Sequence, residues 1–514
     1  MTNPHESGLE KFIAESKSES GERRDDLAQA VLNAHDYVQG SYFVSHPNFD
    51  LGICGSVNDV ILMGLANSIL KRNLLVKGNP GLGKTTTAQA VSSISYRLPI
   101  EFTEECMLQG TPFLTEEKIF GRFDFSKLSE EERVIFSLFS QTPSTKIVDE
   151  INRIPPQTQN ALLKAVETGQ FGYMDHVVRS DIGKHPFFAT ANYSDLGNTE
   201  MSPPFLDRFD VSVEVQQPLW LGSYLMGEPN LAGLMDKQRK SLLEINGAMV
   251  RQIEANPERA KKIEAEARKY AFDIVGGQRI EEQKARISNR NLANRITDIF
   301  MDKKTDYRTK IDEVAKSQSE FGEQISGISI DGQTSEALRI LAKSNMFNPN
   351  AQVYWNSFMD HINCIPKMDG SGPTNHDSSY PVGQVQNELS VRLRTRGREF
   401  AGLISYLKGE DSISVETIGQ VLPYLIAHRA IFSDEVEADT SDLSNSLSMR
   451  NARRVVKSFG ESVYGPHKDD LERLYGSLGN PAEFVDKYAD HTEPSIREFV
   501  RRFQNSSGVE SGED

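Results

Sequence analysis

Alternating strand and helix patterns occupy the first half of the chain. Short apolar runs predict the strands, and apolar residues at helical spacing predict the helices between them. The strands are expected at 73–76, 100–103, 146–148 and 186–191, and the helices at 56–70, from Thr85 onward and at 157–167. Because strands that alternate with helices form a parallel sheet covered by helices on both faces, we predict an α/β core over residues 50–217.

The pattern after Gln217 changes to helices alone. Apolar residues recur at helical spacing in Leu242, Ile245, Met249 and Ile253, and Pro or Gly pairs at 256–257 and 276–277 break the run into separate helices. A stretch rich in Gly, Ser, Pro and Asn over 367–381 predicts a long loop before a second helical block at 384–432. The core is therefore expected to carry an all-helical lid domain that is enlarged by a helical insertion.

These patterns divide the chain into seven predicted segments. They are a leader over 1–49 that is partly disordered or helical, the core over 50–217, the helical insertion and first part of the lid over 218–385, the helical lid over 386–432, an acidic linker over 433–446, a helical C-terminal segment over 447–503 and a disordered tail over 504–514.

Charge and composition narrow the functional classes. The chain holds 57 Lys and Arg against 73 Asp and Glu, a formal net charge of −16, which argues against broad nucleic-acid binding. The first twelve residues lack the layout of a secretory signal, and the apolar stretch Val60–Leu70 is too short to cross a bilayer. Three widely spaced cysteines, Cys54, Cys106 and Cys364, fit reduced thiols. We expect a soluble cytoplasmic protein without membrane contact.

A phosphate-binding loop follows the first predicted strand. Residues 78–85 read Gly-Asn-Pro-Gly-Leu-Gly-Lys-Thr and fit the pattern G-x-x-x-x-G-K-[ST], between a strand and a helix as the mechanism requires. Backbone N–H groups of such a loop surround the phosphates, the Lys84 ammonium reaches the β and γ phosphates, and the Thr85 hydroxyl binds Mg²⁺. The predicted nucleotide-binding residues are Gly78, Asn79, Pro80, Gly81, Leu82, Gly83, Lys84, Thr85 and Thr86.

Two adjacent carboxylates end a later apolar strand, Lys146–Val148. Asp149 is suited to hold the Mg²⁺ shell, and Glu150 to position and polarise the attacking water. Alone this pair is weak, because many solvated turns carry acids, but its place about sixty residues after Lys84 strengthens it. The expected cofactors are ATP and Mg²⁺, with Thr85 and Asp149 on the metal.

The run Asp-Glu-Ile-Asn-Arg-Ile-Pro-Pro-Gln-Thr-Gln-Asn-Ala-Leu-Leu at 149–163 resembles the signature of MoxR-type AAA+ ATPases. The resemblance covers residues 55–215 and 386–432. It implies an AAA+ core with a helical lid, ATP hydrolysis in a hexameric ring, and a chaperone-like role on a protein client, often beside a separate partner with a von Willebrand factor A domain.

Three further positions follow from the same resemblance. Asn192, at the end of Ala-Thr-Ala-Asn, is similar to the sensor 1 residue, Arg208 in Phe-Leu-Asp-Arg-Phe-Asp to the arginine finger that completes a neighbour's site, and Arg392 to sensor 2. The alternatives are an ordinary surface arginine at 208 and a solvated basic helix face at 392–398. Departures at Ser202–Phe205 and at Val391 indicate a divergent member.

Two other constellations stay open. The segment 106–139 lies where relatives carry a hairpin that faces the ring's pore, so Phe113, Phe120 and Phe123 are candidates to contact a client. The alternative is that Phe120, Phe123 and Phe125 close a small core. His361, Cys364 and His376 have no zinc-like spacing, and we predict no metal site there.

The sequence favours an ATP hydrolase that remodels or matures a partner protein, with Glu150, Asn192, Arg208 and Arg392 in catalytic roles. A helicase-like motor and a nucleotide-gated scaffold are the alternatives. A helicase should show a basic pore hairpin, and a scaffold would not need intact hydrolytic residues. The insertion over 221–329 is expected to pack on the lid without joining the α/β core, either as the surface that recognises the partner or as a stabilising spacer.

Overall fold

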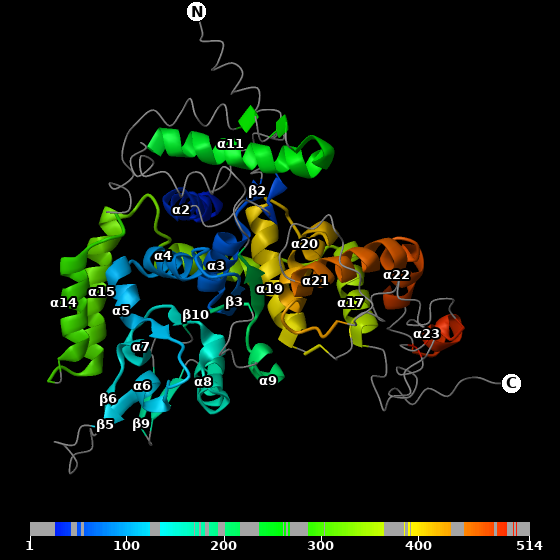
Figure 1. The fold of residues 1–514 in the computed structure, drawn as a ribbon. Helices are drawn as coiled ribbons and strands as arrows, with labels where there is room; N and C mark the ends of the chain where they lie inside the picture. The colour runs from blue at the N-terminus through cyan, green and yellow to red at the C-terminus, as the bar shows by residue number, and fades with distance from the viewer. Residues whose placement is uncertain are drawn as a thin grey trace, which may run out of the picture. The chain divides into compact units, whose positions relative to one another are not determined.

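Two compact units make up the chain, residues 1–340 and residues 341–514 (Figure 1). The computed structural model describes residues 26–42, 49–52, 56–123, 134–168, 170–173, 176–179, 185–193, 201–215, 236–260, 286–302, 304–363, 392–432, 447–476 and 481–490, with a few single positions between these ranges.

A five-stranded parallel sheet lies at the centre of the first unit. Its spatial order is β11-β3-β10-β7-β4, from strands Val211–Glu214, Asn73–Lys77, Phe187–Ala191, Lys146–Asp149 and Leu108–Gln109. The register pairs Ala191 with Lys77 and Gln109 with Asp149, so the strands end at a common carboxyl edge. The α/β fold class predicted from the sequence is confirmed.

Helices and short hairpins make up the rest of the described first unit, and its last helix, α16, continues past the unit boundary at Ile340. The helices are α2 (Asp26–Tyr42), α3 (Asp59–Leu70), α4 (Lys84–Tyr96), α5 (Ile100–Cys106), α6 (Glu116–Phe120), α7 (Leu138–Gln141), η3 (Ile151–Arg153), α8 (Pro156–Thr168), α9 (Pro203–Leu206), α11 (Asp236–Ala255), η5 (Pro257–Arg259), α14 (Arg290–Met301), α15 (Tyr307–Gln324) and α16 (Gly332–Ser344). The antiparallel pairs are β1 (Phe49–Asp50) with β2 (Ser56–Val57), β5 (Gly121–Phe123) with β6 (Val134–Phe136), and β8 (Gln170–Tyr173) with β9 (His176–Arg179).

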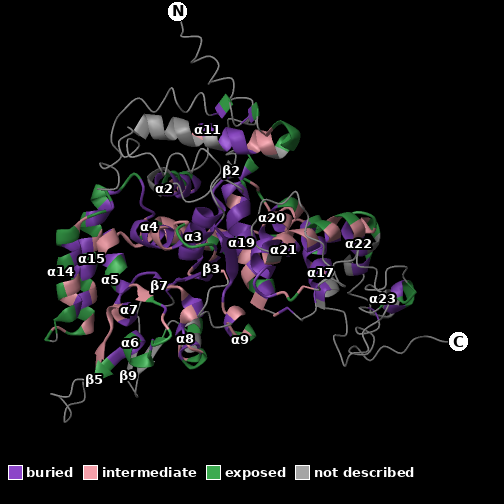
Figure 2. Ribbon diagram, viewed as in Figure 1, coloured by how far each residue is buried: buried purple, intermediate pink, exposed green. Residues whose placement is uncertain are grey.

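Helix α3 is buried along its whole length (Figure 2). It packs between the sheet, α4 and α2, so the helix of the predicted leader belongs to the first unit. The Asn58 side chain caps α3 by accepting from the N–H of Ile61, and His35 of α2 accepts from the N–H of Asn58 at 2.9 Å. The helix predicted from Ser56 therefore begins three residues later, because Ser56 and Val57 form strand β2.

The strand predicted at 100–103 is wrong, because these residues form the first turn of helix α5. Pro99 precedes the helix, and Phe102 and Cys106 lie four residues apart on its buried face. A segment of only four residues in which Ile100 and Phe102 alternate with Glu101 and Thr103 fits either structure, and the packing partner decides between them. The edge strand of the sheet is instead β4, which follows directly.

The expectation that the insertion does not join the α/β core is wrong for helices α14 and α15. Helices α14 and α15 pack against the core helix α5 and the end of α4 (Figure 1). The rings of Phe102 and Phe300 stack with centroids 6.2 Å apart, and the N–H of Ile100 donates to the carbonyl of Ile287 at 2.8 Å. These helices therefore extend the hydrophobic core of the first unit.

The second unit is helical in its described part. It contains α17 (Pro349–Asn363), α19 (Arg392–Leu407), α20 (Val415–Ile426), α21 (Leu447–Ser458), the π-helical segment η6 (Phe459–Tyr464), α22 (Lys468–Gly476) and α23 (Pro481–Tyr488). Helix α20 packs on α17, α19 and α21. A cluster of edge-to-face and stacked rings joins α17 to η6 and consists of Tyr354, Phe358, Phe459 and Tyr464.

Candidate nucleotide site

The glycine-rich loop joins β3 to α4 at the carboxyl edge of the sheet. Gly83 directly precedes α4 with φ 77°, a left-handed conformation that favours glycine. The N–H of Gly78 donates to the carbonyl of Ala191, which fixes the start of the loop against the neighbouring strand β10. The loop thus presents the amino terminus of a 13-residue helix, where backbone N–H groups and the helix dipole favour an anion.

The Lys84 side chain is buried at the base of this loop. Its Nζ donates to the carbonyls of Gly78 and Asn79 at 2.9 and 2.7 Å, and to Oδ1 of Asn192 at 2.9 Å. Burial lowers the pKa of Lys84, while the carboxylates of Asp149 and Glu150 act in the opposite direction. The ammonium group therefore sits among oxygen acceptors beside the position where a phosphate would bind.

Asp149 meets two hydroxyl groups at the same edge. Thr85 Oγ1 donates to Asp149 Oδ1 at 2.6 Å, and Thr190 Oγ1 donates to the same oxygen. A threonine hydroxyl next to a carboxylate gives the hard oxygen ligands that Mg²⁺ prefers, and Mg²⁺ in such sites takes few protein ligands besides phosphate oxygens. These residues fit a magnesium ion, which Thr85 and Asp149 would hold, and the ion would neutralise phosphate charge.

Asn192 contacts one oxygen of the Glu150 carboxylate. Asn192 Nδ2 donates to Glu150 Oε1 at 2.8 Å, and its Oδ1 faces Lys84, so the Asn192 amide links the two predicted residues. Asn152 Nδ2 donates to the backbone carbonyl of Asn192 at 3.0 Å. The structure thus brings Lys84, Thr85, Asp149, Glu150 and Asn192 together, as the sequence predicted.

Sequence reasoning missed three residues around Glu150. Gln109 Nε2 and Arg153 Nε contact Glu150 Oε2 at 3.1 and 3.2 Å, and Thr190 Oγ1 accepts from the N–H of Glu150 at 3.0 Å. Gly110 passes so close that a Cβ there would lie 2.1 Å from the Glu150 carbonyl oxygen. The strand that positions Gln109 is only two residues long, so periodicity gave no signal for it.

Arg208 does not join this group. Its carbonyl accepts from Asn73 Nδ2 at 2.6 Å, which places it at the amino end of β3, and its Nε lies 3.6 Å from Glu167 Oε2. Strand β3 has five residues, and four steps of roughly 3.3 Å separate its ends by about 13 Å. The Arg208 backbone therefore lies at the end of the sheet where the strands begin, and the phosphate loop lies at the opposite end.

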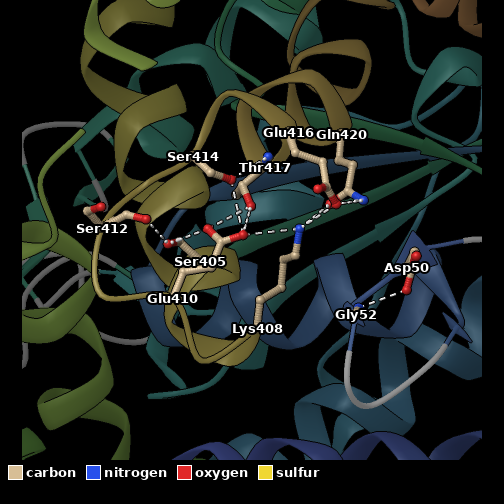
Figure 3. Close-up of polar contacts among 10 residues, drawn as sticks. All are labelled: Asp50, Gly52, Ser405, Lys408, Glu410, Ser412, Ser414, Glu416, Thr417 and Gln420. Carbon is tan, nitrogen blue, oxygen red and sulfur yellow. Dashed lines mark hydrogen bonds and ion pairs between the residues drawn. The ribbon is translucent and has the colours of Figure 1, made fainter. Parts of the chain in front are cut away.

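Arg392 belongs to the second unit. It is half-buried at the start of α19, and its N–H donates to Ser390 Oγ at 3.2 Å. Lys408 follows the other end of α19, where its Nζ contacts Glu410 and Glu416 (Figure 3). Glu410 also accepts from Ser405, Ser414 and Thr417, and this network fixes the turn between α19 and α20.

The aromatic residues of segment 106–139 divide between surface and core. The Phe120 side chain is buried in the cluster that contains Phe139 and Phe205, whereas Phe113 is 81% exposed. The Phe123 side chain and the whole of Phe125 lie outside the described residues. The side chains of His361, Cys364 and His376 lie outside them too, and the described residues contain no group of three His, Cys, Asp or Glu arranged for a metal ion.

Residues 73–209 match the AAA domain (dynein-related subfamily). The uncharacterized protein YeaC of Bacillus subtilis is 27% identical over 168 residues, which are 31% of this chain and 48% of YeaC, so the match spans about half of that relative. A crystal structure named "putative ATPase" from Cytophaga hutchinsonii aligns with 14% identity and a TM-score of 0.42, over 84% of this chain and 93% of that one.

The segment 73–209 is therefore an AAA domain, and it contains the assembled phosphate loop and paired carboxylates. This class of domain implies nucleotide binding and supports ATP hydrolysis in general terms. Among the described helices, none is both long and apolar enough to cross a membrane.

Proposed function

We propose that this protein is a MoxR-like, Mg²⁺-dependent AAA+ ATPase that hydrolyses ATP in an oligomeric ring and uses the cycle to remodel or mature a partner protein. The observation that carries this proposal is the hydrogen-bonded series from Lys84 through Asn192 to Glu150 beside Asp149 and Thr85. Phosphate binding, water positioning and metal ligation are thus adjacent at one edge of the sheet, where open α/β folds bind their ligands.

Each residue takes a defined part in the proposed hydrolysis. The loop N–H groups and Lys84 bind the phosphates, and Thr85 and Asp149 would hold the metal ion. Glu150 Oε1 accepts a proton or hydrogen bond from the attacking water, and Asn192 fixes the direction of that oxygen. A bound phosphate competes with Asn192 Oδ1 for Lys84, so nucleotide occupancy changes the contacts of the residue that orients Glu150.

The ring is supported by the position of Arg208. Because it lies at the sheet edge opposite its own phosphate loop, its guanidinium is suited to a neighbouring subunit's nucleotide. A closed ring lets every subunit give one arginine and receive another, and we propose a hexamer. Arg392 is proposed as sensor 2 within the same cycle.

The partner is proposed to be a protein, and a separate chain with a von Willebrand factor A domain is one candidate. The proposed compartment is the cytoplasm. Exposed Phe113 is suited to contact a client. Gln109 and Gly110, at the start of the same loop, are hydrogen-bonded to Glu150 and Asp149, so the loop connects Phe113 to the proposed hydrolytic residues. The outer face of α15, with exposed Glu313 and Glu323, is one described part of the insertion that is available to a partner.

Phosphate release and nucleotide titration test the enzymatic part of the proposal. Lys84→Ala should greatly weaken ATP binding, whereas Glu150→Gln should bind ATP and lose hydrolysis. Normal turnover by Glu150→Gln would refute the assigned role. For the partner, the ATP-loaded Glu150→Gln protein serves as a trap, and the trap with Glu313→Lys and Glu323→Lys serves as its comparison. Capture that both traps retain would exclude the outer face of α15, and hydrolysis stimulated by DNA would favour the helicase-like alternative.

A further inference from the structure

The second carboxylate oxygen of Glu150 has its own pair of donors. Asn192 occupies Oε1, whereas Arg153 Nε and Gln109 Nε2 approach Oε2 at 3.2 and 3.1 Å. Gln109 comes from the edge strand β4, and Arg153 from the turn directly after Glu150. The carboxylate is therefore held on both oxygens: a neutral amide contacts Oε1, and a neutral amide together with a guanidinium contacts Oε2.

The backbone brings Arg153 into this position. Glu150 has φ 51° and ψ 47°, the left-handed conformation, and the chain then forms the single 3₁₀ turn Ile151–Arg153. The N–H of Arg153 donates to the Glu150 carbonyl at 2.9 Å, which closes the turn and returns the guanidinium to the carboxylate. Thr190 and Gly110 hold the Glu150 backbone in this conformation.

We propose that Arg153 is a positioning residue for hydrolysis, which holds Glu150 Oε2 so that Oε1 is directed towards the attacking water. This inference rests on the proposed ATPase function. The guanidinium is planar and always charged, so its ion pair with Oε2 restrains the direction of the carboxylate. Arg153 acts through Glu150 and needs no contact with the nucleotide.

The expected effect is on turnover more than on binding. Arg153 and Glu150 are 35% and 21% exposed, so solvent screens the attraction and its share of stability is small. A shift of about 1 Å in a catalytic group can nevertheless lower a rate by roughly 10²-fold. Arg153→Ala should therefore lower kcat by about tenfold or more while KM for ATP stays within about twofold.

The experiment compares Arg153→Ala and Arg153→Lys with a matched control, Arg339→Ala. Arg339 forms the same kind of i,i+3 pair, with Glu336 at 2.5 Å, and is 29% exposed on α16. Steady-state phosphate release gives kcat and KM, and a fluorescent ATP analogue gives binding. Single-turnover phosphate release, which detects the slow residual hydrolysis of Glu150→Gln, shows whether adding Arg153→Ala lowers it further, and so tests whether Arg153 acts through Glu150.

The inference expects a lower kcat for Arg153→Ala, a partial recovery with Arg153→Lys, no change for Arg339→Ala, and no further loss when Arg153→Ala is added to Glu150→Gln. An unchanged or raised kcat in Arg153→Ala, or an equal extra loss in the Glu150→Gln background, would overturn it. Lost analogue binding in both Arg153 variants would also overturn it, because the role would then be structural. Absence of hydrolysis in the unmodified protein would instead refute the proposed function.

Discussion

Asn192 donates to Glu150 Oε1 through its amide nitrogen, and its amide oxygen accepts from Lys84. One neutral side chain thus touches both Lys84, which is proposed to bind phosphate, and Glu150, which is proposed to act on water. A shorter side chain at 192 would break both contacts without changing the charge of the site. The consequences for binding and for chemistry can therefore be separated by measurement.

Asn192→Ala should lower the rate of ATP hydrolysis by roughly 10²-fold, because removing one oriented donor from a reacting site commonly has this effect. ATP binding should persist, since the phosphate loop and Lys84 remain. Phosphate release and nucleotide titration measure the two quantities. The control Asn345→Ala removes an amide bonded to the Gly402 carbonyl in the second unit and should leave both unchanged. A loss of binding equal to the loss of rate would contradict this assignment.

Mixed rings test the placement of Arg208. Subunits with Arg208→Ala keep an intact phosphate loop, and subunits with Lys84→Ala keep an intact arginine, so each alone should be inactive. Mixing them should restore part of the activity at interfaces that join an intact loop to an intact arginine. Native mass spectrometry of differently tagged subunits verifies that mixed oligomers form. Mixed oligomers without any recovered hydrolysis would count against action between subunits.

Phe300 should be needed for the stability of the first unit, although it lies about two hundred residues beyond α5. Its side chain is 2% exposed and stacks on Phe102. Phe300→Ala should lower the free energy of unfolding by about 3–5 kcal/mol, because it opens a cavity between α14 and the core. The neighbouring Met301 is 53% exposed, and Met301→Ala should change the stability little. Urea denaturation compares the two, and equal stabilities would show that α14 packs only loosely.

The buried Lys146 side chain is expected to make the free energy of unfolding depend on pH. Its Nζ donates to the carbonyls of Phe139 and Thr142, both at 2.6 Å, and burial lowers its pKa from 10.5 to about 7. A neutral amine still has two N–H groups for these two carbonyls. Below pH 7 the folded and unfolded chains both bind the proton, whereas between pH 7 and 10.5 the unfolded chain binds more.

The free energy of unfolding should therefore rise with pH in that interval, by up to about 1.4 kcal/mol per pH unit from this group. Lys146→Met should lose this contribution to the slope. Urea denaturation of both proteins at pH 7, 8 and 9 gives the difference, and equal slopes would show that Lys146 keeps its proton in the folded state.

The phosphate loop and Asp149 could be recognised in the sequence because their backbone and chemical requirements are local. Asn192 was identified from the family resemblance, and the structure places it beside Glu150. Arg153 stood within the recognised motif, but its contact depends on the left-handed turn at Glu150, which no residue pattern indicates.

Contacts between helices that lie far apart in the sequence could not be predicted. Helical periodicity identified apolar faces after Gln217, yet it did not show that α14 covers α5, because periodicity gives a face and not its partner. The same gap explains the error at residues 100–103, where burial of Phe102 and Cys106 against distant helices favours a helix. The roles of Arg208 and Arg392 depend on other subunits or on nucleotide, so they stay predictions.

The left-handed backbone at Glu150 places stability and activity in opposition. Residues other than glycine, asparagine and aspartate adopt this conformation at a cost of roughly 1 kcal/mol or more. Gly at position 150 would relax that strain, but it would remove the carboxylate that is proposed to act on water. Under the proposed function, selection for thermal stability alone would therefore favour an inactive protein, and the glutamate at this turn would give up folding free energy for hydrolysis.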